Sequence, residues 1–255
     1  MIPLSKKTFI VPILLLLSFV SVLSLSASDS HLEALKRGSS TIFHYNTDDP
    51  VMIPTTYQEQ SHEMRGVWVA TVFNINMPLH ENETQYKAAY QALLDEMLEN
   101  NMNAILFQTR PQNDAFYDSD YATFSRWLTG TEGVDPGWDV MTYMIEEAHA
   151  VGIEFHAWLN PYRVGNSTLE KGAYLATLHE DNFASQSPHL VVGGNPDSNN
   201  IIPYILNPGE PLVKTYIKDV VNELMSLYDV DGIHFDDYFY PYSGIDSDLD
   251  TYETY

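Results

Sequence analysis

Short, mostly apolar segments of strand character alternate with longer segments of helical periodicity, and this alternation restricts the fold more than any other feature. The segments with strand character lie at 66–72, 104–108, 154–159 and 232–235. Between them, apolar residues recur at helical spacing in 86–100, 140–151 and 211–228, as they do in amphipathic helices. Repeated strand–helix units with right-handed crossovers form a parallel sheet covered by helices. The sequence therefore predicts an α/β fold.

The number of strand–helix units indicates part of a barrel. A closed (β/α)8 TIM barrel takes about 250 residues for its eight units. This chain has 255 residues, and its first strand begins near residue 66 and its fourth at residue 232. We therefore predict a fold of the (β/α)8 TIM-barrel type with about the first four strands present, and we expect the natural protein to be longer.

The first 27 residues have the pattern of a signal peptide. Lys6 and Lys7 precede an apolar run at about 9–23, and small residues follow at 24–28, as expected before a signal-peptidase site. The alternative is an uncleaved membrane anchor, because 8–25 approaches the length that spans a bilayer. We predict a signal peptide at 1–27 and an exported protein, secreted or periplasmic, with no stable membrane association after cleavage.

The segment between the signal peptide and the first strand is polar and without periodicity. It contains Pro50 and Pro54, and it predicts a linker or N-terminal arm at 28–63, followed by a domain at 64–255. The chain has no cysteine, so a cysteine-linked lipid anchor and disulfides are both excluded. The fold must therefore be held together by its core.

The composition is strongly acidic, with a formal net charge of −23. Nucleic acids are bound mainly through Lys and Arg contacts with phosphates, and anionic membrane surfaces attract basic segments. The charge therefore argues against both kinds of partner and is compatible with a neutral substrate. No feature of the sequence indicates a cofactor or an oligomeric state.

Two adjacent carboxylates follow the fourth strand. Barrel enzymes carry their catalytic groups at the carboxyl ends of the strands. Because side chains alternate along a strand, Gly232, His234 and Asp236 share the face predicted to point into the barrel opening, and Asp237 points the other way. Asp236 is therefore the first catalytic candidate and Asp237 the second. The alternatives are a buried Asp236 paired with an arginine and an Asp237 that accepts hydrogen bonds from a neighbouring loop.

The same alternation directs side chains of the second and third strands toward this opening. Gln108 and Arg110 share the inward face of the second strand, and His156, Trp158 and Asn160 share that of the third. The predicted substrate-binding residues come from these strands and the loops beyond them: Arg110, Asp114, Trp158, Asn160, Tyr162, Arg163, His234 and Tyr238. Aromatic faces among them can stack on the apolar faces of sugar rings, and no metal site is predicted.

Each of these predictions has a structural alternative. Arg110 and Arg163 are either substrate clamps or charge partners of the acids. Asp114 is either a ligand for sugar hydroxyls or a solvated loop acid. Asn160 precedes a proline and could simply end a strand, while Trp158 could fill the barrel. The two inward histidines could be core histidines whose hydrogen bonds are satisfied by neighbours.

Four blocks of the sequence resemble one family. They are Met-Arg-Gly-Val-Trp-Val-Ala at 64–70, Gln-Thr-Arg-Pro-Gln-Asn-Asp-Ala-Phe-Tyr at 108–117, Trp-Leu-Asn-Pro-Tyr-Arg at 158–163 and Asp-Gly-Ile-His-Phe-Asp-Asp-Tyr-Phe-Tyr-Pro at 231–241. They resemble the glycosyl hydrolase-like 10 family, exported bacterial proteins with a TIM-barrel glycosidase domain. The resemblance covers about residues 64–255 and implies a hydrolase that acts on a glycan.

A second resemblance concerns the nucleophile. Gly-Ile-His-Phe-Asp at 232–236 is similar to the fourth-strand motif Gly-Phe-Arg-x-Asp of alpha-amylase-like glycosidases, although His234 stands where those enzymes have arginine. The similarity implies that Asp236 is the nucleophile. Glycoside hydrolysis normally uses two carboxylates, and Asp236 and Asp237 are expected to face opposite ways. We therefore expect the second acid to lie beyond Tyr255 and this chain to be inactive alone.

The leading hypothesis is thus an exported glycoside hydrolase of polysaccharide or cell-wall glycan. One alternative is a non-catalytic carbohydrate-binding protein or degenerate barrel. A weaker one is a metal-dependent glycan deacetylase, suggested by Phe-Asp-Asp at 235–237. Such sites need paired histidines, and no His-x-x-x-His occurs. Alternating acids at 246–250 resemble a calcium loop, but Thr251 replaces the expected glycine, which favours a solvated loop.

Overall fold

The structure is a computed structural model, and the residues that it describes are 32–56, 62–80, 82–236 and 249–254. The chain forms two compact units, residues 1–62 and residues 63–255. The predicted signal peptide, Asp237 and Tyr238 lie outside the described residues. Within the described part of the chain, no helix is both long enough and apolar enough to cross a membrane.

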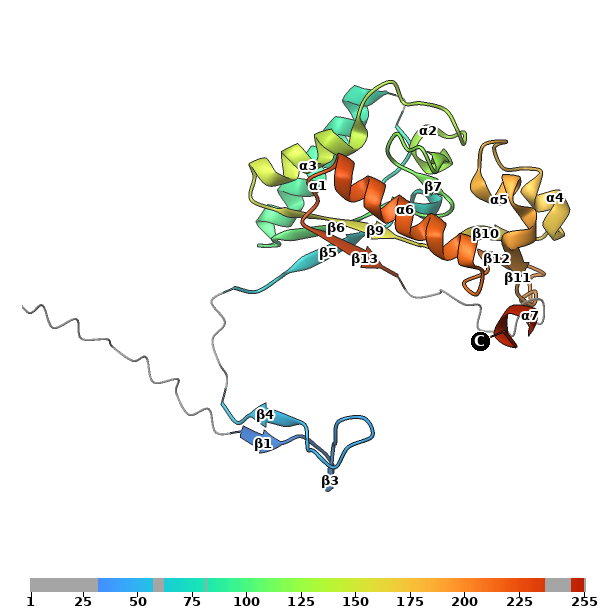
Figure 1. The fold of residues 1–255 in the computed structure, drawn as a ribbon. Helices are drawn as coiled ribbons and strands as arrows, with labels where there is room; N and C mark the ends of the chain where they lie inside the picture. Colours follow the sequence, from blue (N-terminus) through green and yellow to red (C-terminus); the bar gives the residue numbers. More distant parts are fainter. Residues whose placement is uncertain (1–31, 57–61, 81, 237–248, 255) are drawn as a thin grey trace, which may run out of the picture. The chain divides into compact units, whose positions relative to one another are not determined.

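In the first unit, two pairs of short antiparallel strands fold the segment 32–54 back on itself (Figure 1). The strands are β1 (Leu32–Ala34) with β4 (Met52–Pro54), and β2 (Lys36–Arg37) with β3 (Ser40–Thr41). Gly38, in the turn between β2 and β3, has a φ of +63°, which glycine adopts without steric cost. Strands of two or three residues are too short to leave a periodic pattern, so the sequence predicted only a linker or arm here.

Four parallel strands form the main sheet of the second unit (Figure 1). They are β5 (Gly66–Val69), β6 (Ala104–Arg110), β9 (Glu154–Leu159) and β13 (Gly232–Phe235). They are paired in chain order, β5-β6-β9-β13. A doubly wound sheet reverses its strand order near the middle, whereas consecutive strands of a TIM barrel are neighbours. The observed order confirms the predicted (β/α)8 TIM-barrel type, with four barrel strands among the described residues.

A long helix follows each of the first three strands, and the three helices lie on one face of the sheet (Figure 1). They are α1 (Glu83–Glu99), α3 (Val140–Ala150) and α6 (Pro211–Leu227). The side chains of Asn82 and Asp139 cap α1 and α3 by accepting a backbone N–H, and α6 begins at a proline. These are ordinary helix-start residues, and the three helices lie where the periodicity predicts them.

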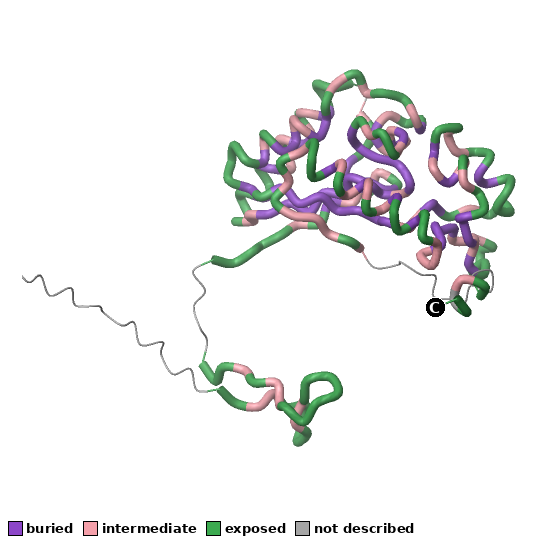
Figure 2. The backbone as a smooth tube through the Cα atoms, in the orientation of Figure 1, coloured by how far each residue is buried: buried purple, intermediate pink, exposed green. Residues whose placement is uncertain are grey.

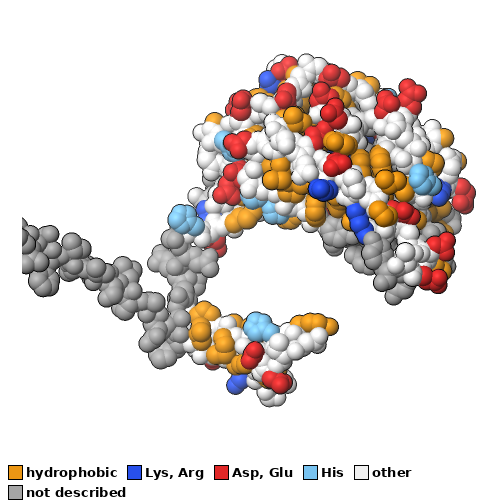
Figure 3. All heavy atoms as spheres, viewed as in Figure 1, with side chains coloured by type: hydrophobic (Ala, Val, Ile, Leu, Met, Phe, Trp, Pro, Cys, Tyr) orange, Lys and Arg blue, Asp and Glu red, His pale blue; other side chains and the backbone are white. Residues whose placement is uncertain are grey.

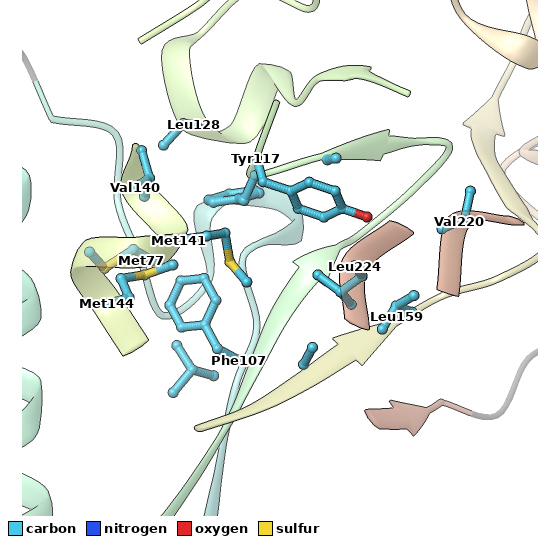
Figure 4. Packing of buried hydrophobic residues seen from close by; sticks show 14 of the residues in the cluster. Met77, Phe107, Tyr117, Leu128, Val140, Met141, Met144, Leu159, Val220 and Leu224 are labelled. Carbon is cyan, nitrogen blue, oxygen red and sulfur yellow. The ribbon is translucent and has the colours of Figure 1, made fainter. Parts of the chain in front are cut away.

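The core of the second unit lies between the sheet and these helices (Figure 2). Ile105 and Phe107 of β6 are fully buried and belong to the same hydrophobic cluster as Met141 and Met144 of α3. Figure 4 shows Phe107 together with these two methionines. On the opposite face of the sheet, the side chain of Trp68 stays 50% exposed. The outward and inward faces predicted from strand alternation are therefore present in β5 and β6.

Two insertions extend the carboxyl ends of the strands. Between β6 and α3 lie β7 (Asp114–Ala115), its partner β8 (Thr123–Phe124) and α2 (Arg126–Thr129). Between β9 and α6 lie an antiparallel sheet of β10 (Arg163–Ser167), β12 (Ile202–Leu206) and β11 (Val191–Gly193) and the short helices α4 (Lys171–Leu175), α5 (Phe183–Gln186) and η2 (Pro188–Leu190). A short helix α7 (Leu249–Tyr252) lies near the end of the chain. The insertions thus add structure beside the strand ends that carry the candidate site.

The first barrel strand is shorter than its sequence predicts. The prediction was 66–72, but β5 ends at Val69 and a 3-10 turn, η1 (Val72–Asn74), follows. The backbone N–H groups of Thr71 and Val72 donate to the side chain of Gln108, each over 2.9 Å, and not to a backbone carbonyl of β6. The end of β5 is therefore tied to a side chain of β6.

Gly232 in β13 lies too close to β9 to accept a side chain. A Cβ atom added at Gly232 would lie 2.3 Å from Nδ1 of His156. We expect Gly232→Ala to lower the free energy of unfolding by about 1–3 kcal/mol, the usual range for overpacking. Urea denaturation of the purified protein measures this change.

Gly172→Ala in α4 is the matched control, because nothing lies within 4 Å of the added Cβ. Alanine in a helix is favoured over glycine by roughly 0.5–1 kcal/mol, so this variant should be at least as stable as the parent. Equal stability of the two glycine variants would contradict the close approach of β13 to β9.

Candidate functional site

Asp236 directly follows β13, at the carboxyl end of the fourth barrel strand. Its side chain is half-buried, and its Oδ2 accepts a hydrogen bond from Nδ2 of Asn160 over 2.9 Å. Asn160 in turn directly follows β9, and its backbone N–H donates to the carbonyl of Arg110 over 2.9 Å. The alternation along the strands thus brings the first catalytic candidate and Asn160 together, as predicted.

Gln108 extends this contact across the sheet. Its Nε2 donates to Oδ1 of Asn160 over 2.6 Å, and its Oε1 accepts from the N–H groups of Thr71 and Val72. The ends of all four barrel strands are therefore linked by one continuous chain of side-chain hydrogen bonds, which we call the relay: Thr71 and Val72, Gln108, Asn160 and Asp236. The sequence placed Gln108 on the inward face but gave it no role.

Aromatic side chains cover the same face below the relay. The rings of Trp68 and Trp158 meet edge to face with centroids 4.9 Å apart, and Trp68 also contacts the ring of His234 at 5.7 Å. Trp158 is buried, whereas Trp68 is half exposed. Among the described residues, Nε1 of Trp158 has no hydrogen-bond partner. Trp158 therefore lies on the inward face, as predicted, next to the half-exposed ring of Trp68.

Two inward histidines are hydrogen bonded to each other. Nε2 of His156 lies 3.0 Å from a carboxylate oxygen of Glu154, and Nδ1 of His156 lies 2.8 Å from Nε2 of His234. Since a carboxylate only accepts, Nε2 of His156 carries a proton and donates to Glu154. Burial, and secondarily the charge of His156, lowers the pKa of His234, so neutral His234 is favoured. Its role in substrate binding remains a prediction.

The predicted orientation of Arg110 is wrong. A bulge between Gln108 and Arg110 shifts the register, so that Arg110 lies opposite Leu159 instead of Asn160. A bulge of this kind inserts one residue and turns the following side chain to the other face. Arg110 is 2% exposed, and its Nη2 donates to the hydroxyl of Tyr216 on α6 over 3.0 Å. It points to the helix side, and among the described residues it forms no ion pair with Asp236.

Both expectations for Asp114 are also wrong. A sugar ligand and a solvated loop acid would each face solvent, yet Asp114 is 2% exposed. It lies in β7, where its Oδ1 accepts from the backbone N–H of Gln112 over 3.1 Å. Burial raises the pKa of Asp114 to about 6, although hydrogen bonding with Ser125 opposes the increase. Asp114 thus belongs to the interior of the first insertion and not to the opening.

This raised pKa predicts a pH dependence of stability. Between pH 4 and pH 6 the folded protein binds a proton at Asp114 that the unfolded chain has released, so the free energy of unfolding falls as pH rises through this window. A shift of about 2 pKa units corresponds to about 3 kcal/mol. We expect Asp114→Asn, which cannot ionise, to remove about 2–3 kcal/mol of this fall, measured by denaturation at several pH values.

The control is Asp95→Asn on the exposed face of α1, which should leave the pH dependence of the parent unchanged. If Asp114→Asn and Asp95→Asn gave the same slope between pH 4 and pH 6, the buried position of Asp114 would be contradicted.

The remaining predicted residues lie near the second insertion or outside the described residues. Tyr162 is half-buried and packs against Val192 and Ile205. Arg163 is the first residue of β10 and lies opposite Ile205 of β12. Substrate contacts of Tyr162 and Arg163 remain predictions, and Asp237 and Tyr238 lie outside the described residues.

The second unit has an acidic surface and a cavity on its helix side. Acidic side chains are spread over the visible face of the second unit, where Lys and Arg are few (Figure 3). A cavity of about 520 Å³ lies on the helix side, lined by residues of the first insertion, α5 and α6, including Phe183, Tyr216 and Asp219. Its lining contains no member of the relay, so its volume does not mark the candidate site.

Among the described residues, no three His, Cys, Asp or Glu side chains converge as in a metal site.

Curated relatives match most of this chain. Glycosyl hydrolase YngK of Bacillus subtilis strain 168 is 39% identical over 195 residues, which cover 75% of this chain and 36% of that protein. Glycosyl hydrolase DigH of Escherichia coli K12 is 36% identical over 214 residues, which cover 79% of this chain and 47% of that protein. The chain thus spans less than half the length of each of these relatives.

Solved structures of glycosidases are similar at low identity. The alpha-galactosidase TtGalA from Thermus thermophilus aligns with a TM-score of 0.40 and 12% identity, covering 69% of this chain and 31% of that one. The maltogenic alpha-amylase AmyB from Thermotoga neapolitana aligns with a TM-score of 0.43 and 10% identity, covering 75% of this chain and 42% of that one.

The family comparison covers the whole second unit with its four strands and the relay. The model of the family described as glycosyl hydrolase-like 10 matches residues 63–255. The chain therefore belongs to the glycosyl hydrolase-like 10 family.

Proposed function

We propose that this chain forms part of an exported glycoside hydrolase of polysaccharide or cell-wall glycan and that Asp236 is its nucleophile or general base. The observation that carries the proposal is the position of Asp236 at the carboxyl end of the fourth barrel strand, where it accepts a hydrogen bond from Asn160. Catalytic groups of TIM-barrel enzymes come from these strand ends. The family and the names of its relatives support the same class of reaction.

The chemistry assigns a definite task to Asp236. A glycosidase carboxylate attacks the anomeric carbon directly or removes a proton from the attacking water, while a second carboxylic acid protonates the leaving oxygen. The two carboxyl groups lie about 5–5.5 Å apart in retaining enzymes and about 6.5–9.5 Å apart in inverting ones. We propose that the acid comes from a later strand of a complete barrel, and we expect this chain alone to be inactive.

The inward face beside Asp236 suits a sugar. Trp68 is 50% exposed and meets Trp158 edge to face, so one aromatic surface remains available for the apolar face of a pyranose. The acidic composition, with a formal net charge of −23, would repel an anionic polymer and favours a neutral glycan. The predicted signal peptide at 1–27 supports a substrate outside the cytoplasm.

The test is a glycan digest by a full-length protein that contains this chain. A panel of neutral polysaccharides and cell-wall glycans is incubated with the protein, and new reducing ends are measured with and without a chelator. We expect reducing ends to accumulate in both conditions. Binding of a glycan without new reducing ends would replace the proposal by carbohydrate binding, and release of acetate that a chelator abolishes would replace it by deacetylation.

A further inference from the structure

We propose that Gln108 is a positioning residue that fixes which group Asn160 presents to Asp236, a role whose catalytic part rests on the proposed function of Asp236. Gln108 is fully buried and Asn160 is 3% exposed. Among the described residues, the side chain of Gln108 bonds only to Asn160 and to the backbone of Thr71 and Val72. Gln108 therefore acts through Asn160.

The direction of the relay is forced from one end. Two backbone N–H groups, of Thr71 and Val72, point at the same atom of Gln108, which must be its carbonyl oxygen because N–H groups only donate. The amide nitrogen of Gln108 then faces Asn160, so Asn160 must accept with Oδ1. The same amide consequently turns its Nδ2 toward Asp236. If the Asn160 amide were flipped, its oxygen would face Oδ2 of Asp236 and its nitrogen would face Nε2 of Gln108. Neither pair could form a hydrogen bond.

The orientation of the Asn160 amide determines which oxygen of Asp236 accepts a hydrogen bond. Nδ2 of Asn160 donates to Oδ2 of Asp236, and this hydrogen bond orients the carboxylate. Among the described residues, Oδ1 of Asp236 has no hydrogen-bond partner, and we assign the attacking or proton-accepting role to Oδ1. Misplacing a reacting group by about 1 Å can cost 100-fold in rate. The backbone at the end of the first strand thus sets the orientation of a carboxylate on the fourth.

Gln108→Glu tests the relay with almost no change in shape. The variant keeps an oxygen for the N–H groups of Thr71 and Val72 but loses the donor to Asn160. In a full-length, active protein we expect kcat to fall by roughly 10- to 100-fold, while KM changes by less than about twofold, because Gln108 is buried away from the substrate. Gln186→Glu at the exposed end of α5 makes the same chemical change elsewhere and should retain the kcat of the parent.

A second measurement does not depend on activity. In ¹⁵N-labelled parent protein, the side-chain amide protons of buried Gln108 and Asn160 should exchange slowly with solvent, and those of exposed Gln186 should exchange fast. In Gln108→Glu, the amide resonances of Asn160 should shift as its donor group turns toward the new carboxylate. A protein that fails to hydrolyse any glycan would overturn the function of Asp236 but leave these NMR results to decide the relay.

The relay would be overturned by either of two results. One is a folded Gln108→Glu protein, with the melting temperature of the parent, that keeps the kcat of the parent. The other is fast exchange of the Gln108 and Asn160 amide protons in the parent, which can be measured even if the variant does not fold.

Discussion

Asp236→Asn in the full-length protein is expected to lower kcat for glycan hydrolysis by about 10³-fold or more. Asparagine has the shape of aspartate, so the contact with Asn160 seen for Asp236 leaves little reason for the strand end to rearrange. An amide, however, neither attacks an anomeric carbon nor accepts a proton from water at neutral pH. General acid–base groups contribute about 10²–10⁴-fold, and a nucleophile forms the covalent intermediate itself, so its loss removes that route. Release of reducing ends under saturating substrate measures the loss.

The matched control is the same substitution at the opposite end of the same strand. Asp231, just before β13, accepts from the backbone N–H of Phe155 over 2.7 Å and lies 2.8 Å from Nε2 of His149. Asparagine at position 231 can still accept from Phe155, so Asp231→Asn should keep kcat and lose only about 1 kcal/mol of stability. If Asp236→Asn kept full activity while folding normally, the catalytic carboxylate would have to be another residue.

The anomeric configuration of the products distinguishes the two roles left open for Asp236. Asp236→Gly leaves space at the strand end, and azide can enter it as a substitute nucleophile. If Asp236 is the nucleophile of a retaining enzyme, azide should restore turnover and give a glycosyl azide whose anomeric configuration is opposite to that of the substrate. If Asp236 is instead the base of an inverting enzyme, azide takes the place of the attacking water and gives the same inverted glycosyl azide. The hydrolysis product of the parent then decides: retained anomeric configuration assigns Asp236 as the nucleophile, and inverted configuration assigns it as the base.

The barrel-type fold could be predicted because its signals are local. Each strand and helix carries its own apolar period, and the chain order of β5, β6, β9 and β13 follows the tendency of consecutive strands to be neighbours in a sheet. The inward position of Asn160 and Asp236 needed only alternation along two strands. The meeting of these two side chains over 2.9 Å therefore agrees with the expectation from sequence.

The position of Arg110 could not be predicted because one inserted residue reverses the alternation. Up to Gln108 the pairing of β6 with β9 is regular, and after it the register shifts. No residue type marks this bulge, since the bulged position is occupied by Thr109, an ordinary strand residue. A one-residue shift moves every later side chain to the other face. The side chain of Arg110 therefore points away from the opening and donates to Tyr216 on α6.

Burial of Asp114 and the role of Gln108 depend on contacts far away in the sequence. Asp114 is enclosed because the chain returns through β8 and pairs with β7, and two-residue strands have no period to detect. Gln108 could be recognised as a polar residue that follows the apolar run 104–107 in the same strand, which is a signal that a buried partner is needed. Its partners at the turn after β5 could not be identified without the fold.

Glu132→Ala is expected to lower the free energy of unfolding by about 3–5 kcal/mol, the largest effect on stability among these substitutions. The side chain of Glu132 is only 7% exposed. Four donors from both insertions converge on its carboxylate: Arg126 Nη2 at 2.5 Å, Asn182 Nδ2 at 2.7 Å, Thr123 Oγ1 at 3.1 Å and the backbone N–H of His179 at 3.2 Å. Removing the carboxylate leaves the buried donors of Thr123 and Asn182 without an acceptor, and each unsatisfied buried group costs about 1–3 kcal/mol; the side chain of Arg126 is 32% exposed and adds less.

Burial, and not the length of the ion pair, should decide this result. Glu83 in the first turn of α1 has a similarly short ion pair, 2.6 Å to Lys87. The side chain of Glu83, however, is 48% exposed and that of Lys87 is 35% exposed. Exposed pairs contribute about 0–1 kcal/mol, so Glu83→Ala should cost less than about 1 kcal/mol in urea denaturation. Equal losses for the two variants would mean that water reaches Glu132, and that the two insertions beside the candidate site are not joined by a buried carboxylate.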